Sequence, residues 1–535
     1  MNKSYPENFK NNTTWWEDYK NSRDVIDTKG SNVFAVSPIR SEDNKVRLAI
    51  NSHQPWDGPF AWYEAHVHSE EGWNMAGGLF PGSPVILVGH NENLGWGHTV
   101  NAPDLVDIYE LEIHPENPHL YKFDGDWKLF EAKMVPIKVK LLGPLSWTFK
   151  REVLWSVHGP ALRGKYATYA MRYTNYEDIR VIEQWYRMNK ASNYEEWNAA
   201  MEMAAIPMFG TGYADKEGNI LYLYNAKLPI RKEGYDWTDV LPGNTSEVVW
   251  DDFLPFENLP SVMNPSSGFI QNCNNNPFFT TTGSSNPKKD NFSDTFGIEN
   301  RMSNRAYRAL ELFGNDPSIS GKDFEDYKFD TRYSENSYMS RFVERLISIS
   351  KDFKDERLKE GVEILKSWDK NTDIENKYAS LPIISFGWFM ETDPEEVSDE
   401  TLVESFTYAV KYLYNHYGKL DVIWGKVNRL VRGTLNLAIN GGPDISRAVY
   451  GIPTENGIIK GYAGDAFLML VEWDTNGEVN SRSIHQYGSN TQNSTSTHYS
   501  DQSKLFVEQK LKPVWLDLQS VKENVERIYS PGNSQ

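Results

Sequence analysis

The stretch GSNVFAVSP at residues 30–38 decides how the rest of the sequence is interpreted. The residues before it are polar, whereas apolar side chains dominate from Ser31 onward. The segment KVRLAINSH at residues 45–53 follows across a polar turn at 41–45. Two β-rich runs separated by a short polar turn predict a pair of neighbouring antiparallel strands. The first of these strands therefore begins at Gly30-Ser31.

Strands are predicted on both sides of a helical region. The apolar period changes to that of a helix at 176–205, and residues 301–417 are predicted to be largely helical, ending at Gly418. This order predicts one layered α/β body with a helical excursion around 301–417. The other predicted strands lie at 61–69, 84–91, 105–113, 151–159, 167–175, 212–226 (a hairpin with its turn at 216–219), 464–473 and 478–488.

Composition excludes several classes of function. The net charge is −19 and no long basic run occurs, which argues against nucleic acid or an anionic membrane as the partner. Cys273 is the single cysteine, so an internal disulfide and a cysteine-rich zinc site are excluded. No window reaches the apolar length of a membrane span, and the first residues do not read as a signal peptide.

Common catalytic motifs are also missing. The sequence contains no G-x-S-x-G, no Walker A motif, no dinucleotide fingerprint and no H-E-x-x-H. His66 and His68 lie two residues apart, on the same face of the strand predicted there. Two ligands make only half of a metal site, so polar-face histidines of a half-exposed strand are the favoured interpretation.

Several short motifs follow one another along the chain from Gly30 onward. They are GSN at 30–32, NSHQP at 51–55, GLFPGSP at 78–84 with GHN at 89–91, WGHTV at 96–100, Asp104 with Asp107, and NPSSGFIQNCNNNP at 264–277, followed by Asn300-Arg301. Each piece alone is weak, but their joint order resembles the penicillin acylase family of N-terminal-nucleophile hydrolases. The sequence is most similar to the branch that includes acyl-homoserine lactone, aculeacin and cephalosporin acylases.

The resemblance runs from Gly30 to about Tyr529 and implies a four-layer αββα fold. It implies that residues 1–30 are a spacer or propeptide remnant and that 31–535 are the catalytic β-chain. The precursor would cut itself between Gly30 and Ser31, which frees the α-amine of Ser31. An α-amine has a pKa of about 7.7–8.0, so it can serve as the base for the adjacent hydroxyl.

The resemblance also implies roles for other residues. The backbone N–H of Val100 and the side-chain amide of Asn274 would bind the oxyanion. His53 would orient and tune the amine, and Arg301 would orient the oxyanion asparagine. Each has a structural alternative: a turn-rich loop around Asn274, a strand-end histidine at 53, and a helix-start arginine in a surface ion pair at 301.

Two further sites follow from the same resemblance. Trp56, Trp185 and Met208 would line the acyl pocket. Catalysis would need no cofactor, whereas Asp104, Val106 and Asp107 resemble the ligands of a structural calcium site, with Asp294 as a loose match.

The function implied is hydrolysis of a linear amide bond between an acyl group and an amine. Candidate substrates are an acyl-homoserine lactone, a lipopeptide and a β-lactam side-chain amide, and a long-chain acyl amide is preferred. A non-catalytic remnant that acts only as a binding protein is the alternative, and a metal hydrolase using His66 and His68 is a third hypothesis. Family members have an α chain, which we expect to be a separate product or missing from a truncated or decayed sequence. Most are exported to the periplasm, which the resemblance alone suggests here.

Overall fold

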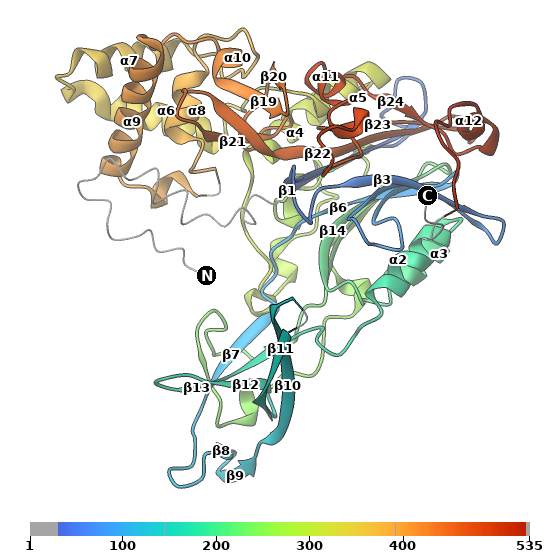
Figure 1. Cartoon of the computed structure of the whole chain (residues 1–535), viewed down its shortest axis with the longest axis vertical. Helices are drawn as coiled ribbons and strands as arrows, with labels where there is room; N and C mark the ends of the chain where they lie inside the picture. The colour runs from blue at the N-terminus through green and yellow to red at the C-terminus, as the bar shows by residue number, and fades with distance from the viewer. Residues whose placement is uncertain (1–29, 144, 391, 531–535) are drawn as a thin grey trace.

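The computed structural model describes residues 30–143, 145–390 and 392–530. Two large sheets stack on each other in the body of the molecule, a helical block lies at one end, and an arm of strands extends away from the body (Figure 1). The predicted spacer at 1–30 lies outside the described residues except for Gly30. Within the described part of the chain, no helix is both long and apolar enough to cross a membrane.

The nine-stranded sheet carries Gly30-Ser31 at the start of its strand β1. The central order is β18-β1-β2-β22-β19-β20. The predicted pairing of the first two strands is confirmed: they are antiparallel, with Gly30 opposite His53 and Ser31 opposite Ser52. The strands are β1 (Gly30–Val36), β2 (Val46–Pro55), β18 (Phe269–Asn272), β19 (Asn428–Arg432), β20 (Leu435–Ala438), β21 (Val449–Pro453), β22 (Ile459–Trp473), β23 (Val479–His485) and β24 (Lys512–Val514).

The seven-stranded sheet lies against the first and has the order β17-β15-β14-β6-β5-β4-β3. Its strands are β3 (Tyr63–Ser69), β4 (Trp73–Leu79), β5 (Val88–His90), β6 (Leu94–Thr99), β14 (Met208–Asp215), β15 (Ile220–Ala226) and β17 (Ser261–Met263). The strand predicted at 84–91 is shorter than expected. There the backbone of Ile86 bonds to a side chain instead of to a neighbouring strand. The Asn189 amide accepts from the Ile86 N–H at 3.1 Å and donates to the Ile86 carbonyl at 2.8 Å.

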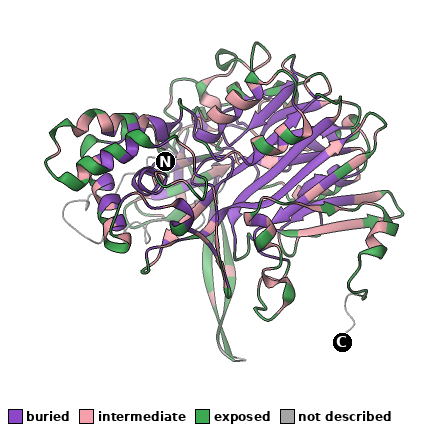
Figure 2. Cartoon of the chain, turned by 90° about the horizontal axis from the view of Figure 1, so that it is seen from above, coloured by how far each residue is buried: buried purple, intermediate pink, exposed green. Residues whose placement is uncertain are grey.

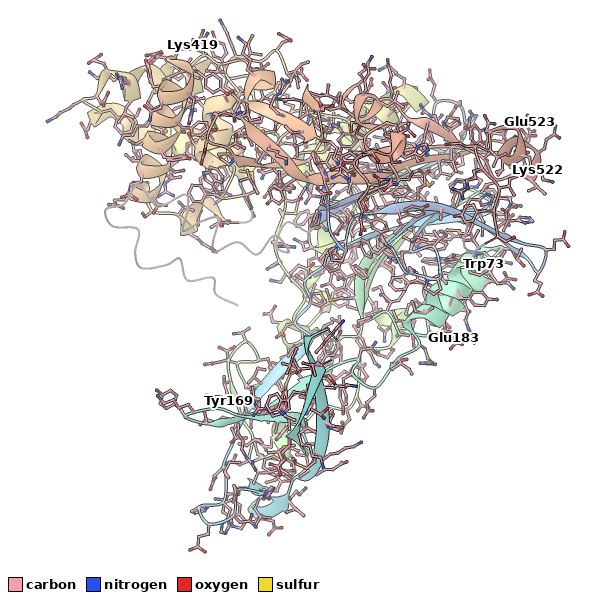
Figure 3. All side chains as sticks on the ribbon, in the orientation of Figure 1. Trp73, Tyr169, Glu183, Lys419, Lys522 and Glu523 are labelled. Carbon is pink, nitrogen blue, oxygen red and sulfur yellow. The ribbon has the colours of Figure 1, made fainter. Side chains whose placement is uncertain are left out.

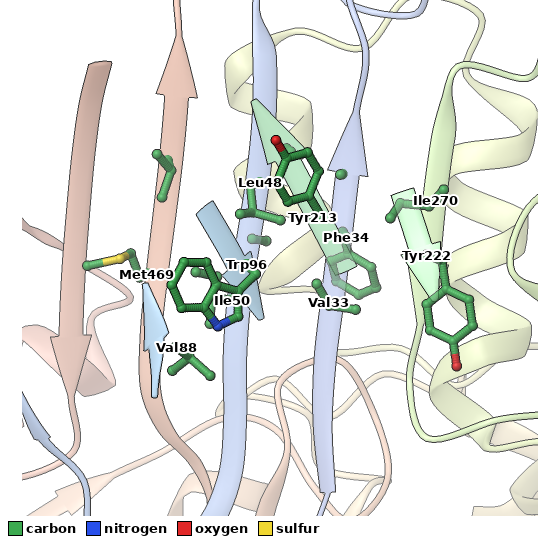
Figure 4. Packing of buried hydrophobic residues seen from close by; sticks show 14 of the residues in the cluster. Val33, Phe34, Leu48, Ile50, Val88, Trp96, Tyr213, Tyr222, Ile270 and Met469 are labelled. Atoms are coloured by element: carbon green, nitrogen blue, oxygen red, sulfur yellow. The ribbon is translucent and has the colours of Figure 1, made fainter. Parts of the chain in front are cut away.

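Close approach of the two sheets depends on glycine. A Cβ added to Gly212 would lie only 2.4 Å from the Val33 side chain, and one added to Gly97 would lie 3.3 Å from both Val33 and Ile50. Val33 and Ile50 occupy this interface between the sheets (Figure 4). Buried residues concentrate in the two sheets (Figure 2).

Helices cover both outer faces. On the nine-stranded sheet, Phe34 packs against Phe313 of α4 with ring centroids 5.1 Å apart. On the seven-stranded sheet, Tyr213 packs against Trp197 of α3 at 4.6 Å. These contacts give the four predicted layers. The covering helices are α4 (Asn304–Asn315), α5 (Gly321–Lys328) and α11 (Ser503–Val507) on one side, and α2 (Val181–Lys190) and α3 (Tyr194–Met201) on the other; a short α12 (Leu518–Glu523) follows.

The helical excursion is smaller than predicted. Helices α4 and α5 belong to the outer layer of the body, because their apolar residues join the main core. The block with its own core consists of α6 (Tyr338–Ile349), α7 (Glu356–Ser367), α8 (Ser380–Phe386), α9 (Asp399–Tyr417) and α10 (Trp424–Val427). The predicted end of α9 is confirmed, since Gly418 caps it with φ 72° in the left-handed region.

The arm is a six-stranded sheet with a third buried cluster. Its order is β10-β11-β12-β13-β7-β16, and β10 pairs with β11 along a long hairpin. The sequence predicted a strand only at 151–159, which covers the second half of β11, and β10 was missed although residues 137–141 alternate between apolar side chains and lysine as a strand does. The strands are β7 (Val106–Leu111), β10 (Glu131–Leu142), β11 (Leu145–Ser156), β12 (Gly159–Arg163), β13 (Thr168–Tyr173) and β16 (Leu241–Pro242), with β8 (Leu120–Phe123) and β9 (Asp126–Leu129) as a separate pair.

Candidate active site

Ser31 lies buried at the start of β1, with 3% of its surface exposed. Its backbone N–H donates to Asn274 Oδ1 at 2.7 Å, and its hydroxyl donates to the Gly30 carbonyl oxygen at 2.5 Å. The hydroxyl therefore lies against the carbonyl of the peptide bond that precedes it. Antiparallel pairing with β2 fixes this geometry on a strand rather than on a loop.

Asn274 reaches Ser31 from the loop after β18. Its backbone has φ 64°, a left-handed conformation that asparagine tolerates better than most residues. The side-chain NH₂ donates to the Val100 carbonyl at 2.8 Å, so the amide lies beside the residue that follows β6. An asparagine NH₂ has two hydrogens, and one bond to Val100 leaves the second for another acceptor.

The neighbouring amides have a different role. Asn272 Oδ1 accepts from the Asn274 N–H and Asn275 Oδ1 accepts from the Cys273 N–H, each at 3.0 Å. Asn276 Oδ1 accepts from the Phe278 N–H at 3.0 Å. These three side chains hold the loop, as the structural alternative predicted, whereas Asn274 reaches Ser31.

The nearby thiol is not a competing nucleophile. Cys273 is buried, and burial raises the pKa of its thiol to about 12. A thiol reacts as the thiolate, so Cys273 stays protonated and inert at neutral pH.

Arg305 is the arginine that contacts this site, and the sequence analysis did not single it out. One terminal nitrogen donates to the Ser31 carbonyl at 2.7 Å and to Asn32 Oδ1 at 2.9 Å, and the other donates to Asn274 Oδ1 at 3.0 Å. Its Nε donates to Asp444 Oδ1 at 2.6 Å, and both residues are 5% exposed or less. The guanidinium thus fixes the asparagine and the serine backbone together.

Arg301, predicted for that role, lies before α4. Its backbone carbonyl accepts two hydrogen bonds from Asn276, at 2.9 Å from the backbone N–H and 3.1 Å from Nδ2. Its Nε is buried without a hydrogen-bond partner among the described residues. Ser303 marks the reason for the difference: it caps α4 by accepting from the Ala306 N–H, so Arg305 lies inside the helix and Arg301 precedes it.

His53 is fully buried at the end of β2, opposite Gly30. Its Nε2 lies 2.9 Å from Asn51 Oδ1 and 3.1 Å from Asp465 Oδ1, so two acceptor oxygens favour the proton on that nitrogen. Its Nδ1 has no hydrogen-bond partner among the described residues, and a Cβ placed on Gly30 would lie 3.3 Å from it. The ring therefore turns an unprotonated nitrogen toward the Gly30-Ser31 segment.

Burial keeps His53 neutral. Desolvation lowers the pKa of His53 to about 4 and outweighs the raising effect of Asp465. Burial also opposes ionisation of Asp465, but Lys328 at 3.1 Å and Arg447 at 2.9 Å hold its pKa below the usual range. Desolvation lowers the pKa of Lys328 to about 8. Asp465, Lys328 and Arg447 are far apart in sequence, and no motif in the sequence analysis pointed to them.

The three predicted acyl-pocket residues are not all together. Trp56 is fully buried in the core, where its indole donates to the Asp465 carbonyl at 2.9 Å and packs on Phe506 and Tyr487. This placement favours a structural role for Trp56. Trp185 of α2 is half-buried and donates to His98 Nε2 at 3.1 Å.

Met208 neighbours that second group only along the chain. It is half-buried at the start of β14 and precedes Phe209, whose ring lies 5.5 Å from the His98 ring. His98 is two residues before Val100 in the chain. A partly exposed group of Trp185, His98 and Phe209 therefore lies beside the strand that leads to Val100. Met208 is not brought into it, since consecutive residues of a strand face opposite sides.

The predicted calcium ligands surround an arginine. Arg231 Nε lies 3.0 Å from Asp107 Oδ2, and another of its nitrogens donates to the Asp104 carbonyl at 2.9 Å. Val106 is exposed, and Asp294 is 95% exposed and points to Lys289 at 3.9 Å. A guanidinium already occupies the space between the two carboxylates, so this set does not fit a calcium ion.

His66 and His68 do not complete a metal site. His66 Nε2 lies 2.6 Å from Asn74 Oδ1, and the two imidazole rings are 6.5 Å apart. Over the described parts of the chain, no group of three or more His, Cys, Asp or Glu side chains is placed to hold a metal ion.

Comparison of the sequence with known proteins identifies its family and its relatives. A family model described as penicillin amidase matches residues 3–523. The acyl-homoserine lactone acylase PvdQ of Pseudomonas fluorescens (strain Pf0-1) is 24% identical over 533 residues, covering 88% of this chain and 67% of the relative. Penicillin G acylase of Escherichia coli is 31% identical over 253 residues, covering 46% of this chain and 29% of that protein. The chain thus spans about two thirds of the length of the first of these relatives.

A solved structure shows the same fold. A thermostable penicillin G acylase from Alcaligenes faecalis matches with a TM-score of 0.69 and 18% identity, covering 94% of this chain and all of that chain. The match confirms the predicted four-layer architecture of N-terminal-nucleophile hydrolases.

Proposed function

The chain belongs to the penicillin amidase family, and on that premise we propose that it releases an acyl group from an amine through an N-terminal Ser31. The relatives with which it aligns are named as acylases, which are hydrolases of amide carbon–nitrogen bonds. The observation that carries the proposal is the position of the Ser31 hydroxyl, 2.5 Å from the Gly30 carbonyl oxygen, while Asn274 accepts from the Ser31 N–H.

Self-cleavage is the first step we propose. Ser31 Oγ attacks the Gly30 carbonyl carbon, and the C–N bond to Ser31 breaks with transfer of the acyl group to oxygen. The hydroxyl proton passes to the departing nitrogen, and His53 Nδ1 is the neutral base that faces this segment. Water then hydrolyses the ester, which releases a carboxylate at Gly30 and a free α-amine and hydroxyl at Ser31.

Amide hydrolysis uses the same atoms. The Ser31 hydroxyl attacks the substrate carbonyl and gives its proton to its own α-amine, directly or through water. The second N–H of the Asn274 amide and the Val100 backbone N–H are proposed to bind the oxyanion. The amine product leaves with the proton, and water hydrolyses the acyl-enzyme. Arg305 keeps the Asn274 amide oriented, since it donates to Oδ1 at 3.0 Å.

The substrate we propose is an amide with a long or aromatic acyl group. Trp185 and Phe209 provide partly exposed apolar surface beside His98, two residues before Val100. The relatives' names supply the two probes: an acyl-homoserine lactone and penicillin G.

The test is amine release from these two probes. We expect hydrolysis by the unaltered chain and its loss in Ser31→Ala, whose residual rate should equal that of buffer. Ser37→Ala is the matched control, because Ser37 is a buried serine just after β1 whose hydroxyl, among the described residues, bonds only the Gly268 carbonyl, at 3.2 Å. Equal activity in Ser31→Ala and the unaltered chain would overturn the proposed nucleophile.

We also propose that a second polypeptide, like the remaining third of the relatives, covers one face of the arm. Apolar side chains dominate that face near the turn of the hairpin, where Ile137 lies opposite Phe149 and Val139 opposite Trp147, and three of these four are exposed. Lys133 and Arg151 lie on the same face farther from the turn. The opposite face carries Lys138, Lys140 and Lys150. The hairpin projects from the body (Figure 2), and the same apolar face continues through Trp155 of β11, Leu162 of β12 and Tyr169 of β13, the last labelled in Figure 3.

Contiguous exposed apolar surface marks interaction sites, and a two-stranded hairpin is marginally stable alone. We expect the purified chain to self-associate unless it is co-expressed with such a polypeptide. Trp147→Lys should weaken capture of that polypeptide and reduce self-association, whereas Lys138→Ala on the opposite face should change neither. Unchanged capture by Trp147→Lys would contradict the assigned face.

A further inference from the structure

The neck between body and arm is held by one buried arginine. Asp104 and Asp107 lie where the chain leaves the body and enters β7, and Arg231 follows β15 from the seven-stranded sheet. A third segment, at Thr295 to Gly297, leads toward α4 and Arg305. The Asp104 N–H donates to the Gly297 carbonyl at 2.9 Å, so the segments already touch at this point.

Each of the three nitrogens of the Arg231 guanidinium donates a hydrogen bond. Its Nε donates to Asp107 Oδ2 at 3.0 Å, one terminal nitrogen donates to the Asp104 carbonyl at 2.9 Å, and the other donates to the Thr295 carbonyl at 3.1 Å. The Asp104 carboxylate lies 3.5 Å away, and the arginine side chain is fully buried. The Trp250 indole donates to the same Asp107 oxygen at 2.6 Å.

From this arrangement we propose that Arg231 occupies the place of a structural cation, which makes the neck independent of calcium. Calcium needs six to eight oxygen ligands, commonly carboxylates and backbone carbonyls. The carbonyls and carboxylates that converge here already face a fixed positive charge. Asp107 Oδ1 is the one buried carboxylate oxygen of the group without a hydrogen-bond partner among the described residues, and one oxygen does not make a calcium site.

Packing is tight where the third segment meets the guanidinium, at Gly297. Even a Cβ on Gly297 would lie 2.6 Å from the Asp104 Cβ and 3.1 Å from an Arg231 terminal nitrogen. A divalent ion at this point would also face the arginine charge at short range in a buried setting, which is unfavourable.

Arg231 is therefore a positioning residue for the candidate active site. It joins the segment that follows Val100, the start of the arm, and the segment that leads to Arg305. A cation supplied by the chain cannot be removed by a chelator, so the spacing of these segments does not depend on the calcium concentration.

The first experiment uses the unaltered chain and two readouts that do not involve activity. We expect the same thermal unfolding midpoint in millimolar calcium and in EDTA. We also expect no saturable terbium emission on excitation of tryptophan, although Trp250 would sensitise a terbium ion bound at Asp107. A calcium-dependent midpoint or saturable emission that calcium displaces would overturn the proposal.

The second experiment changes the arginine. Arg231→Ala should lower the unfolding midpoint by about 5 °C or more, because it leaves buried Asp107 without its ion pair. Calcium should then restore part of the loss, since the oxygen ligands remain. The control is Arg163→Ala, which removes an exposed ion pair to Glu152 on the same arm and should leave the midpoint unchanged. A midpoint for Arg231→Ala equal to that of the control, or without any response to calcium, would contradict a cation role for Arg231.

Discussion

Asn274 has three contacts at the candidate site that no neighbouring amide shares. Its Oδ1 accepts from the Ser31 N–H and from Arg305, and its NH₂ donates to the Val100 carbonyl. The left-handed backbone at φ 64° points the side chain out of the loop. One amide thus positions Ser31, the proposed nucleophile, and retains a hydrogen for the proposed oxyanion contact.

Replacement of Asn274 by glycine should remove the side-chain contacts and keep the backbone conformation. Glycine adopts a positive φ without cost, so Asn274→Gly keeps the loop while removing the amide. We expect kcat for acyl release to fall by about 10²–10³, with a smaller change in KM. Steady-state kinetics on self-cleaved protein measures this, and a kcat within twofold of the unaltered chain would exclude Asn274 from oxyanion binding.

The arginine at the site shows the limit of sequence reasoning for single residues. Arg301 and Arg305 lie in one short segment, and only the position of the helix start distinguishes them. The N-capping Ser303 is a signal in the sequence that would have placed Arg305 inside the helix. The partner Asp444, 139 residues away along the chain, has no such local signal.

At the scale of elements, the spacing of the two sheets depends on small residues that face each other. Gly212 of β14 and Gly97 of β6 oppose Val33 of β1, the strand that begins at Gly30-Ser31. The hairpin that contains Gly212 was predicted from its turn at 216–219, and it is confirmed as β14 and β15. Its packing partner was not predictable, because strand alternation gives the face of a residue but not the opposing sheet.

A methyl group at Gly212 should force the sheets apart. Because the added Cβ would lie 2.4 Å from Val33, we expect Gly212→Ala to lower the free energy of unfolding by about 1–3 kcal/mol. Chemical denaturation measures the change. Gly442→Ala is the control, since a Cβ there meets its nearest neighbour at an ordinary 3.4 Å. Equal stability of the two variants would show that the sheets tolerate wider spacing.

For the whole molecule, burial of neutral histidines sets the response to acid. Desolvation lowers the pKa of four of them to about 4, namely His53, His90, His158 and His485. The ordinary histidine pKa is about 6.5, so between these values the unfolded chain binds more protons than the folded one. Folding is therefore favoured above about pH 6.5 and weakened progressively toward pH 4.

Urea unfolding at a series of pH values should reveal this loss. We expect the free energy of unfolding to fall from pH 6.5 to pH 4.5, by up to about 3 kcal/mol for each buried histidine as an upper limit. His485→Gln should flatten the profile by one such contribution. A profile that is level or rises on acidification would show that these histidines are solvated.

The layered body followed from the sequence more fully than the rest of the molecule. Alternating apolar residues and the ordered motifs predicted the sheets, the outer helices and the segment at Ser31. The arm was not foreseen as a separate sheet with its own core, because its hairpin is exposed on both faces. The buried cluster of Asp465, Lys328 and Arg447 forms only when distant elements pack together.

The intact mass and N-terminal sequence of the purified protein show whether Ser31 becomes a free N-terminus. We predict loss of residues 1–30 and a free Ser31 at the new N-terminus, in the unaltered chain and not in Ser31→Ala. Two preparations are compared: the chain expressed alone, and the chain co-expressed with the proposed second polypeptide. An uncut chain that nevertheless hydrolyses the amide probes, or one that stays uncut in both preparations, would contradict an N-terminal serine as the nucleophile.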